Sequence, residues 1–176
     1  MEYYCAMVMT GCERSFKAFA KEQFHEDFPS AEFFFFERKM RTNQGKWFDA
    51  PLFPGYIFFS VDSLSKEFFT RLRKISGFCR VLPDNAAPLK ITGSALDELK
   101  LFIKNGENWG ISKVKFLPGK QIRVSSGPLC GMEGMIYKVN KKRKRITVYS
   151  SLVSGSMKFD LFYEDVDLVD EGPEKS

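Results

Sequence analysis

Hydrophobic positions in the first sixty residues alternate between strand-like and helical spacing. Tyr3 to Val8 is predicted to form a strand, and after Gly11 the apolar side chains up to Phe24 recur on one face of a helix. Two aromatic-rich runs, Glu32 to Arg38 and Gly55 to Val61, have strand character, and the stretch between them is polar. This pattern predicts a long hairpin with an exposed tip.

The next forty residues add two helices and a strand. The predicted elements are a helix from Lys66 to Ile75, a strand from Phe78 to Leu82 and a helix from Ser94 to Lys104, with Ser94 as N-cap and Asp97 in the capping-box position. The order β-α-β-β-α-β-α predicts one antiparallel sheet flanked by helices, an α+β fold.

After Lys104 the pattern changes. The stretch "NGENWGISK" has two Gly, two Asn and no periodicity, which is typical of a linker. Short β-runs with tight turns follow, and so short a sheet must close to bury its edges. We expect a small five-stranded SH3-like β-barrel with strands at Gln121–Val124, Gly134–Val139, Arg145–Ser150, Met157–Leu161 and Val166–Val169. The predicted organisation is a first domain at residues 1–105, a linker at 106–114, the barrel at 115–170 and an acidic tail at 171–176.

The charge of the chain is unevenly distributed, although its formal net charge is only +5. Lys115 to Tyr163 holds ten Lys and Arg against two acids, whereas Glu164 to Ser176 holds one Lys against six acids. A basic surface of this kind indicates a polyanionic partner, and an acidic tail folding back over it is the alternative.

Several classes of protein are disfavoured by the sequence. No apolar run approaches the roughly 20 residues of a membrane span, and the N-terminal "MEYYCAMVMTG" lacks the basic region of a signal peptide. We therefore expect a cytoplasmic protein without membrane contact. The four cysteines lie far apart without a CxxC pair, which predicts buried thiols. The one histidine, His25, lies among acids, and no GxSxG, P-loop or HExxH motif occurs. We expect a monomer without catalytic residues, cofactor or metal.

Two segments of the chain carry motifs of a known protein family. In "FLPGKQIRVSSGPLCGMEGMIYKVNKKRKRITVYSSL", the matching residues are Pro118-Gly119, Val124, Gly127-Pro128, Gly131 and Glu133-Gly134. Through them this segment resembles the KOW motif that closes transcription factors of the NusG family. "PLFPGYIFF" resembles the central signature of the NusG N-terminal domain, and Gly11 with the helix after it also matches. The resemblance extends from Tyr3 to about Val169. It implies a transcription elongation and antitermination factor that binds RNA polymerase.

The resemblance also assigns a role to "PLFPGYIFF". In the family this segment forms part of an apolar pocket that binds the tip of the clamp coiled coil of RNA polymerase. By position, the pocket residues are Met7, Phe53, Pro54, Tyr56 and Phe58. Because side chains alternate along a strand, we expect about half of the segment to be core, with Ile57 and Phe59 inward. Phe53, Tyr56 and Phe58 are expected to be exposed. Phe68-Phe69-Thr70 fall near a segment that makes a second polymerase contact in RfaH-type relatives, and the alternative for the two Phe is that they are core.

Basic residues form two candidate nucleic-acid sites. The hairpin tip lies in the family near the upstream fork of the transcription bubble, and its cations lie beside Trp47 and Phe48, which suits upstream DNA or the non-template strand; a solvated loop is the alternative. The second site is "KVNKKRKR", a predicted turn whose six cations have no acid among them and suit nascent RNA. The residues are Arg38, Lys39, Arg41 and Lys46 in the hairpin and Lys138, Lys141, Lys142, Arg143, Lys144 and Arg145 in the turn.

The C-terminal segment departs from housekeeping relatives. Its basic KOW domain resembles specialised paralogues of the LoaP/RfaH type, of which the LoaP type engages structured RNA. Val153-Ser154-Gly155-Ser156 replaces the Phe-Gly-Arg loop that serves Rho and ribosome contacts in the family, so we expect neither partner here. RfaH-type relatives refold this domain between helix and barrel, but Gly127, Pro128, Gly131 and Gly134 oppose a helix and predict a constitutive barrel. The alternative to the family assignment is a KOW-containing ribosomal or general RNA-binding protein without polymerase affinity, which leaves "PLFPGYIFF" unexplained.

Overall fold

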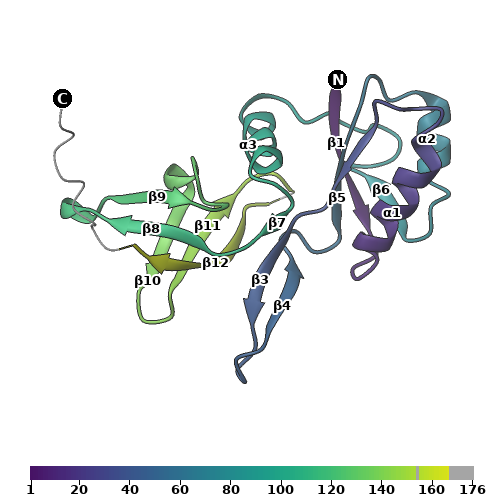
Figure 1. Cartoon of the computed structure of the whole chain (residues 1–176). Helices are drawn as coiled ribbons and strands as arrows, with labels where there is room; N and C mark the ends of the chain where they lie inside the picture. The colour runs from purple at the N-terminus through teal and green to yellow at the C-terminus, as the bar shows by residue number, and fades with distance from the viewer. Residues whose placement is uncertain (154, 167–176) are drawn as a thin grey trace, which may run out of the picture.

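The N-terminal unit, which extends from β1 to α3, is built on a four-stranded sheet in the order β2-β5-β1-β6. The structure is a computed structural model that describes residues 1–153 and 155–166. Figure 1 shows α1 and α2 on one side of this sheet and α3 on the other. The elements are β1 (Glu2–Val8), α1 (Glu13–Phe24), β2 (Glu32–Phe34), β5 (Tyr56–Val61), α2 (Lys66–Leu72), β6 (Phe78–Val81) and α3 (Gly93–Lys104). The α+β fold predicted for this unit is confirmed.

Strand alternation gives this sheet two apolar faces. On β5, Ile57 and Phe59 are buried under α1 and α2 together with Phe68 of α2. Phe58 lies between them in sequence and therefore belongs to the opposite face, where α3 contributes Phe102. Both faces of the sheet are thus covered.

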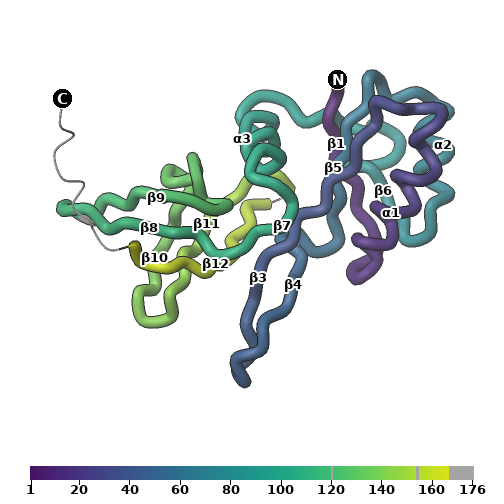
Figure 2. The backbone as a smooth tube through the Cα atoms, viewed as in Figure 1, coloured from purple at the N-terminus to yellow at the C-terminus, as the bar shows by residue number. Residues whose placement is uncertain are grey.

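The two runs predicted to form a long hairpin pair antiparallel, as β2 with β5. The polar stretch between them, expected as an exposed tip, forms a hairpin of its own from β3 (Glu37–Arg41) and β4 (Trp47–Pro51), which pair antiparallel around a turn at residues 42–46. Figure 2 shows this hairpin extending away from the body of the molecule. A short strand, β7 (Asn108–Trp109), pairs parallel with the base of β3. The stretch expected to be a linker, residues 106–114, therefore contains strand residues.

The C-terminal unit, which extends from β8 to β12, is a curled five-stranded sheet in the order β10-β11-β12-β8-β9. Its strands are β8 (Ser112–Phe116), β9 (Ile122–Ser126), β10 (Ile136–Asn140), β11 (Arg145–Ser150) and β12 (Met157–Asp165). The predicted fold is confirmed, but the fifth strand is β8, which pairs parallel with β12. Residues 167–169 of the strand expected at 166–169, and the acidic tail at 171–176, lie outside the described residues.

Two smaller expectations are wrong. Helix α3 begins at Gly93, one residue before Ser94, because Thr92 adopts the extended backbone of the N-cap; no side chain caps the helix. The four cysteines are free thiols, but only Cys5 is buried, and Cys79 is exposed. Burial raises the pKa of the Cys5 thiol above its ordinary value.

Within the described part of the chain, no helix is both long and apolar enough to cross a membrane.

A shared apolar core joins the two units. Phe53 of the N-terminal unit has its ring centroid 5.6 Å from that of Phe102 on α3 and 5.8 Å from that of Phe159 on β12. Trp109 on β7 lies 4.5 Å from Phe102 and 6.2 Å from Phe159. These four side chains are almost fully buried, so the C-terminal unit packs directly on the face of the N-terminal sheet that carries Phe58.

Candidate functional site

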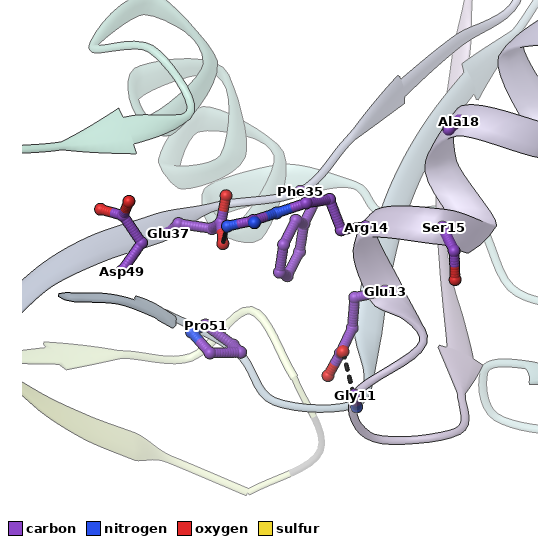
Figure 3. Close-up of a pocket in the computed structure, with 9 residues that line it drawn as sticks. All are labelled: Gly11, Glu13, Arg14, Ser15, Ala18, Phe35, Glu37, Asp49 and Pro51. Atoms are coloured by element: carbon purple, nitrogen blue, oxygen red, sulfur yellow. Dashed lines mark hydrogen bonds and ion pairs between the residues drawn. The ribbon is translucent and has the colours of Figure 1, made fainter.

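The "PLFPGYIFF" segment is fixed to the start of α1 by a buried carboxylate. Glu13 is 2% exposed, and its two oxygens accept hydrogen bonds from the backbone N–H groups of Gly55 and Gly11, each at 2.7 Å. Figure 3 shows Glu13 pointing from α1 toward Gly11. The position also suits a negative charge, because Glu13 lies in the first turn of the helix.

Gly55 is required at this turn by its backbone and its surroundings. Its φ is +82°, and a Cβ there would lie 3.2 Å from Thr10 Oγ1 and 3.4 Å from the Val8 carbonyl oxygen. The Val8 N–H donates to the Gly55 carbonyl at 2.8 Å. The turn before β5 is therefore held at a fixed distance from the end of β1.

A cleft of about 620 Å³ lies beside this turn, between the start of α1 and the β3–β4 hairpin. Figure 3 shows Arg14 reaching across it toward Glu37, with which it forms an ion pair that raises the pKa of Arg14. Asp49 is paired with Lys39 at 2.8 Å. The charged groups that line the cleft are thus engaged in structural contacts. Across the described residues, no group of three or more His, Cys, Asp or Glu side chains is placed to hold a metal ion.

Of the residues assigned to polymerase binding, Met7 and Tyr56 are strand partners on β1 and β5, whereas Phe53 and Pro54 lie in the turn before β5. Tyr56 and Phe58 belong to the core that faces α3, and Ile57 and Phe59 are buried under α1 and α2, as the alternation predicted. The expected exposure of Phe53 and Phe58 is wrong, since each is only 1% exposed.

The C-terminal unit contributes to this burial, because Phe159 of β12 packs against Phe53, whereas Phe58 packs against Phe36 and Phe53 of its own unit. Of the assigned residues, Pro54 is exposed, whereas Met7 and Tyr56 are half-buried. Of the alternatives for Phe68-Phe69, Phe68 is core, and Phe69 is half-buried.

Polar contacts from α3 also hold the two units together. The side-chain amide of Asn105 donates to the carbonyl oxygens of Pro128 at 2.8 Å and of Cys130 at 3.0 Å. Glu98 accepts hydrogen bonds from the hydroxyls of Ser150 and Ser151. Neither Asn105 nor Glu98 was singled out from the sequence, because their partners lie more than twenty residues away.

The four hairpin cations have different surroundings. Arg38 is half-buried, donates to the Asp160 carbonyl oxygen of β12 at 2.7 Å, and has its pKa lowered mainly by burial. It therefore takes part in the contact between the two units. Lys39 is paired with Asp49, whereas Arg41 and Lys46 are exposed at the tip. The Arg41 guanidinium carbon lies 5.6 Å from the ring centroid of Trp47.

The basic turn, residues 138–145, projects from the C-terminal unit between β10 and β11 (Figure 1). Lys138 and Lys141 to Lys144 are exposed, and Arg145 is half-buried beside Asp160. Lys144 pairs with Asp165. Within the residues that the structure describes, Lys138, Lys142 and Arg143 form no ion pair. Among the described residues, these three cations of the turn thus have no acidic partner and are exposed to solvent.

Residues 1–100 match the family model described as "Transcription termination factor nusG". The chain is also similar to the transcription termination/antitermination protein NusG of Xylella fastidiosa (strain 9a5c), with 26% identity over 121 residues, which cover 62% of this chain and 64% of that protein. The corresponding NusG of Pseudomonas aeruginosa is 25% identical over 134 residues, which cover 74% of each chain. This chain therefore spans about 64% of the length of the Xylella relative.

A solved structure shares the fold. The structure described as "Domain interaction in Thermotoga maritima NusG" superposes with a TM-score of 0.55 at 16% sequence identity, covering 92% of this chain and 93% of that one. At this identity the similarity concerns the arrangement of the backbone. It includes both the N-terminal and the C-terminal units.

Proposed function

The chain belongs to the NusG family, and we propose that it is a transcription elongation and antitermination factor that binds the clamp of RNA polymerase and suppresses pausing or termination. The observation that carries the proposal is the aromatic face at Tyr56 and Phe58, held in place by the buried carboxylate of Glu13. Aromatic side chains on a rigid base provide the anchors that a helix-in-groove contact needs. Proteins of this family are transcription factors rather than enzymes.

Polymerase binding through this face requires the two units to separate. Phe159 of the C-terminal unit packs against Phe53 in the docked arrangement. Phe58 is in contact with Phe53 and with Phe36 of its own unit. A coiled coil can therefore reach Phe53 from the side of Phe159 only after the C-terminal unit moves away. The docked and separated forms are then in equilibrium, and polymerase selects the separated one. In this proposal the domains are residues 1–105 and 115–170, as the sequence predicts, with 106–114 between them.

The basic turn supports a nucleic-acid contact by the C-terminal unit. Exposed cations such as Lys142 and Arg143, which have no acidic partner among the described residues, attract phosphate and make binding strongly salt-dependent. We assign the chain to the specialised LoaP/RfaH type on this basis, with nascent RNA at the basic turn and upstream DNA or the non-template strand at Lys39, Arg41 and Lys46 of the hairpin. The factor acts as a cytoplasmic monomer and needs neither Rho nor ribosome contacts.

A binding experiment with core RNA polymerase tests the first part. Full-length wild type and Tyr56→Ala are compared by pull-down at two salt concentrations. Tyr56 is half-buried at the edge of the aromatic face, so its truncation removes an anchor without opening the core. We expect binding that resists salt and that falls about tenfold or more in the variant. Phe19→Ala, on the exposed face of α1, is the matched control and should bind as wild type does. No binding by the wild type would favour the general RNA-binding alternative.

A charge reversal tests the second part. Lys142→Glu, Arg143→Glu and Lys144→Glu together should abolish binding to a structured leader RNA and leave polymerase binding intact, because the turn lies outside the core that joins the two units. RNA affinity that is unchanged in this variant would contradict the assignment of the turn.

A further inference from the structure

The outer face of the C-terminal sheet carries exposed aromatic side chains. On β11, Ile146 and Val148 point into the core, so the neighbouring Tyr149 points outward and is 42% exposed. Tyr137 on β10 is 61% exposed and lies at an irregularity in the pairing of β10 with β11. Large aromatic rings on an outer sheet face contribute nothing to the core of this unit.

Cations are interleaved with these rings. Lys158 on β12 is the strand partner of Tyr149, and its Nζ lies 3.6 Å from the ring centroid of Tyr137. Toward the basic turn, the Arg145 guanidinium carbon lies 4.8 Å from the ring centroid of Phe162, also on the outer side of the sheet. Each end of this face therefore combines an aromatic ring with a positive charge.

The face continues onto the hairpin of the N-terminal unit. The ring of Trp47 on β4 packs edge-on against Phe162, with centroids 5.0 Å apart, and Trp47 is itself 40% exposed. Figure 1 shows the β3–β4 hairpin and the β10–β11 turn projecting toward the same side of the molecule. Rings from three strands and one hairpin thus line a single surface.

An acid on this surface is already engaged. Asp160 lies between the two ends of the face, accepts a hydrogen bond from the Thr147 hydroxyl at 2.6 Å, and lies 3.8 Å from the Arg145 guanidinium. Its charge is thereby offset within the sheet. The combination of aromatic rings and cations on this surface favours the binding of a polyanion that itself has exposed aromatic rings.

We propose that this surface, comprising Tyr137, Tyr149, Lys158, Phe162, Arg145 and Trp47, is a stacking site for single-stranded nucleic acid. The proposal rests on the nucleic-acid contact proposed above and extends it from phosphate attraction to base stacking. Unpaired bases expose both ring faces and stack on aromatic side chains, while cations beside the rings hold the phosphates. A duplex hides those base faces, so it can use only the cations.

The test uses the full-length protein and labelled oligonucleotides of about 12 nucleotides, within the range that stacking sites span. Affinities for single-stranded RNA, single-stranded DNA and the duplex of the same sequence are measured by fluorescence anisotropy. We expect the single strands to bind more tightly than the duplex. Tyr137→Ala with Tyr149→Ala should weaken single-strand binding about tenfold or more, because each stacked base loses its ring. If single-stranded RNA binds more tightly than single-stranded DNA, the ligand of the site is the transcript. If DNA binds more tightly, the ligand is the displaced DNA strand.

Two control variants separate stacking from structure. Tyr137→Phe with Tyr149→Phe keeps both rings and should bind as wild type does, whereas Phe19→Ala removes an exposed ring far from the sheet and should change nothing. Duplex affinity equal to single-strand affinity, or unchanged single-strand affinity in the alanine pair, would overturn the stacking site.

Polymerase binding by the same variants keeps this proposal separate from the proposed function. The alanine pair should bind core RNA polymerase as wild type does, since both tyrosines lie on the outer face of the C-terminal sheet. If only the charge reversal of the basic turn weakens nucleic-acid binding, the stacking site is wrong and the proposed function stands. If the wild type does not bind core RNA polymerase, the proposed function is wrong, regardless of the affinities measured for the oligonucleotides.

Discussion

The contact between the two units can be weakened at a single side chain, Asn105 at the end of α3. Its amide donates to two carbonyl oxygens of the C-terminal unit, at 2.8 Å and 3.0 Å. Its backbone N–H completes α3 through bonds to Ile103 and Leu101, and an alanine retains these. Asn105→Ala should therefore leave both units folded and remove only bonds between them.

The magnitude follows from the two hydrogen bonds. Each contributes about 1 kcal/mol net, so their loss destabilises the docked form by about 2 kcal/mol. Because about 1.4 kcal/mol is a factor of ten, the ratio of separated to docked molecules rises about 30-fold. If polymerase binds only the separated form and the docked form predominates, the apparent dissociation constant falls by the same factor.

The assay is a titration of core RNA polymerase with labelled full-length protein. Asn105→Ala should bind up to about 30-fold more tightly than the wild type. Lys104→Ala, an exposed neighbour on the same helix, is the control and should match the wild type. Equal affinities for wild type and Asn105→Ala would refute the idea that the C-terminal unit and polymerase compete for the aromatic face.

Three further substitutions and one control probe the fold by denaturant unfolding. Glu13→Ala leaves two backbone N–H groups without their carboxylate partner and should lower the free energy of unfolding by about 2 to 4 kcal/mol. Phe68→Ala removes a ring packed against four other phenylalanines and should cost about 3 to 5 kcal/mol. Gly127→Ala should cost about 2 kcal/mol or more, because φ is +97° and the new Cβ would lie 2.7 Å from Ser112 Cα, whereas Gly134→Ala meets nothing within 4 Å and should be neutral. If Gly127→Ala and Gly134→Ala lower the free energy of unfolding equally, β8 does not approach the backbone of Gly127 as closely as the structure shows.

Local periodicity predicted the elements and the faces of the N-terminal sheet, because side-chain alternation is a property of the strand itself. Ile57 and Phe59 could be assigned to the core in this way. The cover on the opposite face could not be predicted, since Phe53 meets Phe159 across more than one hundred residues. The exposure expected for Phe53 was wrong for this reason.

In the stretch that connects the two units, the amino-acid composition was misleading about the structure. The Gly- and Asn-rich stretch after Lys104 is typical of a linker, yet its Trp109 is 1% exposed and central to the shared core. The one large aromatic residue in this polar stretch was the only indication in the sequence that the stretch is packed against a core. Strand β8 was missed because its parallel partner, β12, lies far along the chain. The burial of Glu13 could not be predicted from the spacing of the helix either, because one of the two N–H groups that bind its carboxylate, that of Gly55, lies far along the chain.

Docking covers the aromatic face of the N-terminal sheet but leaves the stacking site exposed, so the two proposed partners favour different forms of the molecule. Trp47 and Phe162 come from different units and meet only when the units are docked. A single strand bound across both rings therefore stabilises the docked form, whereas the clamp coiled coil binds the separated form. Linkage then requires each ligand to weaken the other by the same factor. Anisotropy titrations of a labelled single strand with the full-length protein, with and without the isolated clamp coiled coil, measure this factor. Affinity that is equal or tighter in the presence of the coiled coil would show that stacking does not depend on docking.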